Sequence, residues 1–218
     1  MTSLRTLTLN VRGLKNKKKR HCIFNNLKQN KYDIIGLQEC HILLEKEAEE
    51  WELQWGGKLF YSTGTNRSLG QITLVSKQYM DQTHCVYKDS RIILLETYNA
   101  NKQKILIANV YAPQSTKDKI DFFKHINTII DEYQTDEHHL ILMGDMNTVI
   151  DNDKDVITGQ KHDDKEVKAL NNLMVNNNLI DTWRALHADT KEYTWCRNQP
   201  FIARRIDYMF ISHTLANH

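Results

Sequence analysis

The alternation of strand-like and helix-like segments along the 218-residue chain is the feature that most constrains its fold. Residues 4–11 follow the two-residue period of a strand, residues 17–30 place apolar side chains at helical spacing, and residues 32–37 form a short apolar run typical of a buried strand. The same mixture continues, with helices expected at 43–54, 120–133 and 165–177 and strands at 71–76, 91–98, 104–111, 139–143, 193–197 and 205–212. Such alternation predicts a layered α/β body rather than separate helical and strand-rich halves.

The composition favours a single domain over residues 1–218. The chain has only two prolines and eight glycines, so no Pro-rich or Gly/Ser-rich linker separates two bodies. A hydrophobic share of 40% is enough for a substantial core, and a charged share of 26% is ordinary for a soluble surface. No run approaches the roughly 18 apolar residues that cross a bilayer, and polar residues interrupt the first strand-like segment in a way that a secretory signal does not tolerate. We therefore expect no membrane association.

Charge and cysteine content exclude two further classes of protein. The chain carries 29 basic and 27 acidic side chains, a net charge of +2, so bulk charge alone would not drive tight binding to a polyanion. The basic block at 15–20 and the acidic stretch at 45–52 are most simply solvated helix surface. The four cysteines lie far apart without a Cys-x-x-Cys pair, so we expect reduced thiols rather than a zinc site or a disulfide framework.

Polar side chains stand at the ends of several predicted strands. The first strand leads to Asn10, the second to Glu39, the returning strand of a hairpin to Tyr111, and the next strand to Asp145 and Asn147. Catalytic residues of α/β folds gather at strand ends, where loops converge over a rigid sheet. Taken singly, each residue also has an ordinary structural explanation, such as a solvated turn, a core aromatic or an Asx turn.

Together these five residues fit the chemistry of phosphodiester cleavage. A hard divalent cation such as Mg²⁺ takes one or two carboxylates plus neutral oxygens and waters, and it keeps positions open for a phosphate. Glu39, Asp145, Asn10 and Asn147 would supply that set. Tyr111 and Asn147 are candidate donors to the phosphate oxygens, and Asp145 is a candidate base.

Six short motifs occur in order along nearly the whole chain and carry a family resemblance. They are LTLNVRGL at 7–14, LQECH at 37–41, NVYAP at 109–113, GDMNT at 144–148, YTW at 193–195 and RIDY at 205–208. This series resembles the exonuclease-endonuclease-phosphatase superfamily, and within it the apurinic-endonuclease-type endonuclease domain of LINE (non-LTR) retrotransposons. The segment LIDTWR at 179–184, followed by YTW, favours the retrotransposon branch over the DNA-repair branch.

The resemblance implies a fold and a metal site. The fold would be a four-layer α/β sandwich, with two mixed β-sheets packed face to face and helices outside. The site would lie at the edge where the strand ends meet. There Glu39 would hold the metal, Asn10 would assist it, and Tyr111 would act near the attacked phosphate.

Five more positions are candidate site residues, the first four of them through the same resemblance. Asp145 would position or activate the nucleophilic water, Asn147 would stabilise the transition state, and Asp207 would support the site from behind. Thr194 matches a DNA contact near the cleaved strand. Arg205 is expected to line the DNA groove.

A domain of this kind would be a metal-dependent phosphodiesterase that nicks one strand of double-stranded DNA with Mg²⁺, or with Mn²⁺ in its place. The nick would leave a 3′ hydroxyl that primes target-primed reverse transcription. The resemblance implies a monomeric domain of a longer polypeptide with a reverse transcriptase, made in the cytoplasm and acting in the nucleus. An apurinic/apyrimidinic repair endonuclease is the alternative enzyme.

The sequence departs from the family pattern at its carboxyl end. The pattern closes with a Ser-Asp-His motif after one more strand, and this sequence has no Ser-Asp-His. Only residues 209–218 follow the RIDY motif, too few for the intervening loop and strand. We therefore expect a chain truncated just before that motif, and a non-catalytic DNA-binding remnant stays an alternative to an active enzyme.

Overall fold

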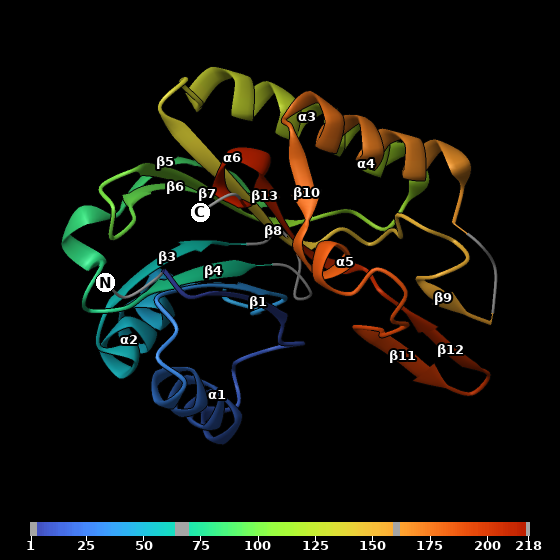
Figure 1. Ribbon diagram of the computed structural model, residues 1–218. Coiled ribbons are helices and arrows are strands. Elements are labelled where there is room, and N and C mark those ends of the chain that lie inside the picture. The colour runs from blue at the N-terminus through green and yellow to red at the C-terminus, as the bar shows by residue number, and fades with distance from the viewer. Residues whose placement is uncertain (1–3, 64–69, 159–161, 217–218) are drawn as a thin grey trace.

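Two β-sheets pack face to face between two layers of helices (Figure 1) in the computed structural model, which describes residues 4–63, 70–158 and 162–216. The first sheet has the strand order β1-β2-β4-β3, with bounds Thr6–Asn10, Ile34–Gln38, Gln71–Val75 and Lys58–Ser62. The second has the order β10-β13-β8-β7-β6-β5, with bounds Leu179–Asp181, Asp207–Ser212, His138–Asp145, Lys104–Tyr111, Ile92–Tyr98 and His84–Lys88. This arrangement confirms the predicted four-layer α/β sandwich.

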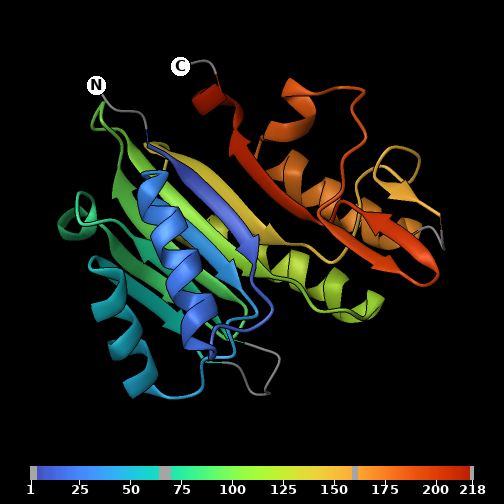
Figure 2. The same ribbon diagram turned by 90° about the horizontal axis from the view of Figure 1, so that it is seen from below.

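Both sheets are mixed, as predicted. Strand β1 runs parallel to β2 and β7 runs parallel to β8, whereas the other pairs in these two sheets are antiparallel. Parallel neighbours end at the same edge of a sheet, so each pair delivers two strand ends to one place. Figure 2 shows the arrowheads of β1 and β8 side by side, which brings the ends of the two pairs together.

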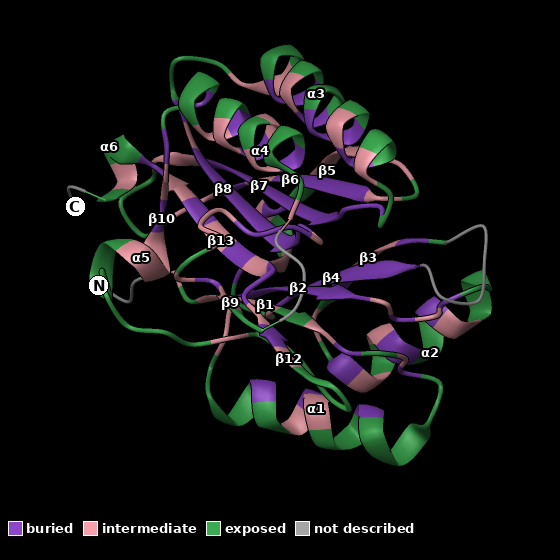
Figure 3. Cartoon of the chain, turned by 90° about the vertical axis from the view of Figure 1, so that its right-hand side faces the viewer, coloured by how far each residue is buried: buried purple, intermediate pink, exposed green. Residues whose placement is uncertain are grey.

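Four long helices cover the outer faces of the two sheets (Figures 1 and 3). Helices α1 (Lys17–Gln29) and α2 (Glu45–Trp55) pack on the first sheet, and α3 (Thr116–Tyr133) and α4 (Asp164–Asn176) pack on the second. The first turn of α3 is closed by the Ser115 side chain, which accepts a hydrogen bond from the Asp118 backbone N–H. Among the described residues, no helix is long and apolar enough to cross a membrane.

Apolar side chains fill all three interfaces between the four layers. The layer between the two sheets includes Ile34, Ile93, Ile107 and Met143, all fully buried. Burying one such side chain stabilises the fold by about 1.5–3 kcal/mol relative to leaving it exposed. The two sheets are therefore held as one rigid block behind the strand ends.

The sequence predicted one strand of a small third sheet, at 193–197, and missed its other two strands and several short helices. The third sheet has the order β11-β12-β9, with bounds Trp195–Asn198, Phe201–Arg204 and Val156–Ile157, and its β11–β12 hairpin projects beyond the sandwich (Figure 1). The short helices are η1 (Met80–Gln82), α5 (Thr182–Leu186) and α6 (His213–Ala216). Elements of two to five residues carry too few side chains to display a period, so the hydrophobic pattern does not mark them.

Helix α3 begins four residues before its predicted start at residue 120. The added turn, residues 116–119, has the polar sequence Thr-Lys-Asp-Lys, so apolar periodicity gives no sign of it. Lys119 in that turn is nevertheless buried. The difference matters because this lysine reaches the loop that follows β8.

Gly144 yields a prediction about stability. Its backbone has φ +148°, and a Cβ atom added there would lie 1.9 Å from the Val110 carbonyl oxygen, so Gly144→Ala must push β7 and β8 apart. We expect a loss of about 3 kcal/mol in the free energy of unfolding, measured by urea denaturation. Gly56→Ala is the control, because Gly56 has φ +76° with no atom within 4 Å of the added Cβ and should cost only about 1 kcal/mol. Equal losses in the two variants would contradict the predicted clash between β7 and β8.

Candidate active site

The second sheet places three polar side chains in a row at its edge. In the register of the strands, Asp145 of β8 lies beside Tyr111 of β7 on one side and beside Asp207 of β13 on the other. Side chains at matching positions of neighbouring strands project from the same face of a sheet. Asp145 is therefore flanked by a phenol and a second carboxylate.

The first sheet contributes two more side chains to the same place. The Asn10 side-chain nitrogen Nδ2 donates to Glu39 Oε1 and to Asp145 Oδ2, both at 2.9 Å. The Tyr111 hydroxyl donates to Glu39 Oε1 at 3.0 Å. The structure thus brings together residues from the ends of β1, β2, β7 and β8, as the strand-end argument predicts.

Asn147 joins this cluster through the loop after β8. Its backbone N–H donates to Asp145 Oδ1 at 2.9 Å, and its side-chain Nδ2 donates to the Ala112 carbonyl at 2.7 Å. Asn147 has φ +48° and Glu39 has φ +53°. Asparagine enters this left-handed region at little cost, whereas glutamate does so rarely, and such strain is concentrated at functional sites.

The electrostatics of the cluster disfavour its full negative charge. Burial and, after it, the neighbouring Asp207 raise the pKa of Asp145 to about 7, although hydrogen bonds from Asn10 and the Asn147 backbone oppose the shift. Burial likewise raises the pKa of Asp207. The pKa of Tyr111 is raised by burial and then by Glu39, so its hydroxyl stays protonated at neutral pH. Ionisation of both aspartates is therefore unfavourable without a cation beside them.

These residues fit a divalent cation. The buried Oδ1 of Asp207 has no hydrogen-bond partner among the described residues, and the Glu39 and Asp145 carboxylates share a single amide nitrogen. Within the described ranges, no group of three or more His, Cys, Asp or Glu side chains is arranged as a ready-made metal cage. This donor set suits a cation such as Mg²⁺, which binds through one or two carboxylates and keeps several waters.

The orientation of Asn10 differs from the predicted role of a metal ligand. Its nitrogen faces the two carboxylates, and its oxygen Oδ1 accepts a hydrogen bond from the Arg12 backbone N–H at 3.1 Å. In this structure Asn10 therefore bridges the acidic side chains and does not offer an oxygen to the space between them. Glu39 and Asp145 are the groups placed to hold a cation.

Thr194 lies on the surface beside the site. The residue is exposed, and its hydroxyl oxygen accepts hydrogen bonds from the backbone N–H groups of Ile206 and Asp207, both at 3.1 Å. The hydroxyl thus also fixes the backbone just before β13. The contact to DNA itself stays a prediction.

The expectation that Arg205 lines a DNA groove is wrong, because its side chain is internal. The residue is only 3% exposed. Its guanidinium donates to Asp155 Oδ1 at 2.8 Å, to Asp155 Oδ2 at 3.0 Å and to Asp181 Oδ2 at 2.7 Å. These partners raise the pKa of Arg205 against the effect of burial. Because both carboxylates are internal, the guanidinium joins buried elements and is not presented to solvent.

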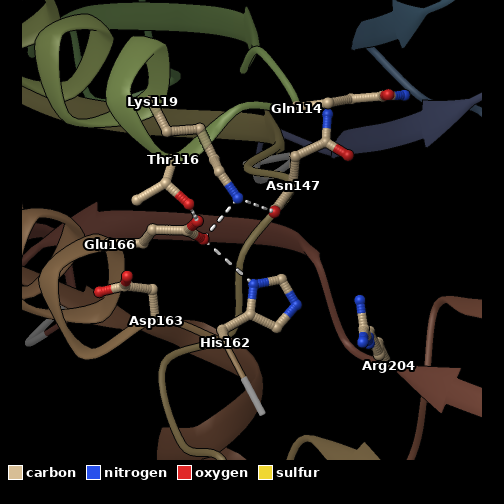
Figure 4. Close-up of a pocket in the computed structure, with 8 residues that line it drawn as sticks. All are labelled: Gln114, Thr116, Lys119, Asn147, His162, Asp163, Glu166 and Arg204. Carbon is tan, nitrogen blue, oxygen red and sulfur yellow. Dashed lines mark hydrogen bonds and ion pairs between the residues drawn. The ribbon is translucent and has the colours of Figure 1, made fainter. Parts of the chain in front are cut away.

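A polar pocket next to Asn147 contains residues that were not predicted from the sequence (Figure 4). The pocket has a volume of about 440 Å³, and its wall includes Lys119 of α3, Glu166 of α4 and His162 before α4. Lys119 and Glu166 form an ion pair of 2.5 Å with side-chain exposures of 3% and 5%. No sequence signal marks them, because a buried lysine and glutamate read like any other charged residues on a helix surface.

The raised pKa of Asp145 predicts how the pH controls stability. Between about pH 4 and pH 7 the native state keeps this proton while the unfolded chain releases it, so this group lowers the free energy of unfolding as the pH rises. Asp145→Asn cannot ionise. Relative to the wild type, it should gain about 4 kcal/mol in the free energy of unfolding between pH 4 and pH 8, measured by urea denaturation in EDTA.

The exposed residue Asp189 provides the matched control for this measurement, because its side chain is 93% exposed. The difference between Asp189→Asn and the wild type should stay nearly constant over the same pH range. Excess MgCl₂ at pH 8 should stabilise the wild type more than Asp145→Asn. A pH-independent difference for Asp145→Asn would refute the shifted carboxyl.

Comparison with known proteins finds matches over nearly the whole chain. Residues 7–218 match the Endonuclease/Exonuclease/phosphatase family. Over 212 residues the chain is 30% identical to the transposon TX1 uncharacterized 149 kDa protein of Xenopus laevis, covering 95% of this chain and 16% of that protein. The chain therefore spans about a sixth of that relative.

Two solved structures have the same fold as the chain. One is the AP endonuclease LMAP from Leishmania major, with a TM-score of 0.74 and 16% identity, covering 99% of this chain and 80% of that one. The other is the endonuclease domain of TRAS1, a telomere-specific non-LTR retrotransposon, with a TM-score of 0.68 and 14% identity, covering 98% and 87%. At these identities the likeness shows the fold alone.

Proposed function

Because the chain belongs to the Endonuclease/Exonuclease/phosphatase family, we propose that it is a Mg²⁺-dependent endonuclease domain that nicks one strand of double-stranded DNA. The observation that carries the proposal is the single hydrogen-bonded cluster of Glu39, Asn10, Tyr111 and Asp145 at the meeting strand ends. An acidic cluster whose full ionisation is unfavourable suits a cation and a phosphate together. Mn²⁺ would replace Mg²⁺ because it accepts the same oxygen ligands.

Each side chain of the site has a separate role in hydrolysis. Asp145 accepts a proton from the attacking water, whose oxygen forms a bond to phosphorus as the bond from phosphorus to the 3′ oxygen breaks. The 3′ oxygen takes a proton from solvent, so the products are a 3′ hydroxyl and a 5′ phosphate. A cation held by Glu39 would neutralise the charge that builds on the phosphate and on the leaving oxygen.

Two neutral donors complete the site. The Tyr111 hydroxyl stays protonated and can turn from Glu39 to a non-bridging phosphate oxygen. The Asn147 amide uses one N–H on the Ala112 carbonyl and retains a second N–H for the transition state. Asp207 lies behind Asp145 and raises its pKa, which makes Asp145 a stronger base.

The transposon relative supports a context for this activity. At 30% identity over almost the whole chain, the match favours a mobile-element protein over a repair enzyme. We propose that the domain belongs to a longer polypeptide with a reverse transcriptase, acts as a monomer on nuclear DNA, and leaves a 3′ hydroxyl that primes reverse transcription. A repair endonuclease specific for abasic sites is the second candidate, suggested by the Leishmania neighbour.

Nicking of supercoiled plasmid by the 218-residue chain tests the activity directly. We expect Mg²⁺-dependent conversion to open circles, and a loss of about 100-fold or more in Glu39→Gln and Asp145→Asn, because each removes a charged group from the reacting centre. The control is Glu137→Gln. The Glu137 side chain is 73% exposed and precedes the first residue of β8, whereas Asp145 is the last residue of that strand. A folded wild-type chain that binds DNA without nicking it would overturn the proposal and support the non-catalytic alternative.

Oligonucleotides separate the two candidate enzymes. A duplex with one abasic site and an intact duplex of the same sequence should be cut at rates within about tenfold of each other if the domain acts on ordinary target DNA. Cleavage confined to the abasic duplex would instead assign the domain to repair. End analysis of the product should find a 3′ hydroxyl.

A further inference from the structure

A buried ion pair of Lys119 and Glu166 contacts the backbone carbonyl of Asn147 (Figure 4). Lys119 of α3 donates from Nζ to the Asn147 carbonyl oxygen at 2.8 Å and to Glu166 Oε2 at 2.5 Å. Thr148 donates from its hydroxyl to the same Glu166 oxygen at 3.1 Å. The pair therefore binds the peptide on both sides, through the carbonyl of one residue and the side chain of the next.

Glu166 is fully occupied by this arrangement. Its other oxygen, Oε1, accepts a hydrogen bond from the Thr116 hydroxyl, and His162 Nδ1 lies 3.2 Å from Oε2. Burial lowers the pKa of His162, so its imidazole is neutral at pH 7. The ammonium of Lys119 is therefore the one full positive charge among the described residues that bond to this carboxylate.

A buried ion pair of this kind contributes little to the stability of a fold by itself. Removing two charges from water costs several kcal/mol per ion, and well-packed apolar side chains of similar volume often serve as well or better. The attraction between Lys119 and Glu166 and their hydrogen bonds offset this cost. Two of those bonds, from Lys119 to the Asn147 carbonyl and from Thr148 to Glu166, hold the loop that carries Asn147.

The conformation of Asn147 depends on that support. The residue is in the left-handed region, with its N–H on Asp145 and its side-chain nitrogen on Ala112. Without the lysine, the buried side of its carbonyl loses a charged donor, and the peptide is free to rotate toward a commoner conformation. Such rotation would move the Asn147 amide away from Asp145.

We propose that Lys119 and Glu166 are positioning residues, which act on the reaction by holding the Asn147 amide in place beside Asp145. The inference rests on the proposed function, because it gives Asn147 a part in phosphodiester cleavage. Neither residue touches the substrate. Their effect passes through one peptide and should therefore vanish when the Asn147 side chain is absent.

A double-mutant cycle tests this dependence. Lys119→Met should lower kcat for nicking by about 10- to 100-fold with little change in KM for DNA, since a displacement near 1 Å is enough for such a loss. In an Asn147→Ala background, Lys119→Met should change kcat less than about twofold. Equal losses in both backgrounds would overturn the proposal, because Lys119 would then act independently of Asn147.

The matched control is Lys124→Met, which removes a lysine from the same helix. The Lys124 side chain is 75% exposed and is paired with Asp121, so its loss should leave nicking unchanged. If Lys119→Met does not fold, Thr148→Val removes a smaller part of the same support. It should lower kcat about 3- to 10-fold, again only when Asn147 is present, and an unchanged kcat would overturn the proposal.

A measurement without turnover separates this proposal from the proposed function. In Lys119→Met, amide hydrogen exchange of Asn147 should accelerate at least tenfold, with shifted NMR signals for its backbone and side-chain N–H groups. Signals of the central strands should stay in place. If the wild type fails to nick DNA, the proposed function falls while exchange still reports the positioning. Unchanged Asn147 exchange and signals would overturn the positioning role whatever the activity.

Discussion

The rest of the site depends on one amide group that joins the two sheets. Asn10 at the end of β1 donates both of its contacts to carboxylates, one from each sheet, at the edge where the strands finish. Behind it, Gln38 of the first sheet donates to Asn109 of the second at 2.6 Å, and Asn109 donates to Thr73 at 3.1 Å. Gln38, Asn109 and Thr73 are buried, and a lost hydrogen bond between buried polar groups is costly, so the sheets must keep one fixed register to retain these bonds. The geometry of the acidic cluster is thus a property of the sandwich as a whole.

Two basic groups near the acidic cluster do not neutralise it, because each is paired with an internal carboxylate. Arg205 and Lys119 lie in adjoining elements, yet each is taken up by internal carboxylates, Asp155 and Asp181 for the arginine and Glu166 for the lysine. The negative charge at the strand ends is therefore left uncompensated by these two basic groups. In the proposed reaction, a cation that enters with the substrate phosphate would offset this charge. Without it, burial and then the neighbouring Asp207 carboxylate raise the pKa of Asp145.

Much of the fold and the main residues of the site could be predicted from the sequence. The long helices and the long strands carry clear periods. The strand-end argument selects Glu39, Tyr111 and Asp145, which the structure links either directly or through Asn10. Burial of polar residues could not be predicted in the same way. Arg205 stands in a motif next to Asp207 and reads as a surface base, but its partners come from sequence positions 24 and 50 residues away. Lys119 is hidden for the same reason, because a charged side chain shows its partner only after the chain has folded.

Two site residues are held in strained backbone conformations. Glu39 and Asn147, on opposite sides of the cluster, both adopt left-handed backbone conformations, and only for asparagine is this inexpensive. Around Glu39 the strain is opposed by backbone hydrogen bonds, from Gly13 N–H to the Glu39 carbonyl at 2.6 Å and from Cys40 N–H to the Gly70 carbonyl at 2.7 Å. A conformation that costs of order 1–3 kcal/mol persists only where its surroundings leave no alternative. The backbone conformation of Glu39 therefore directs its carboxylate towards Asn10 and Tyr111, and the packing of the two sheets maintains that conformation.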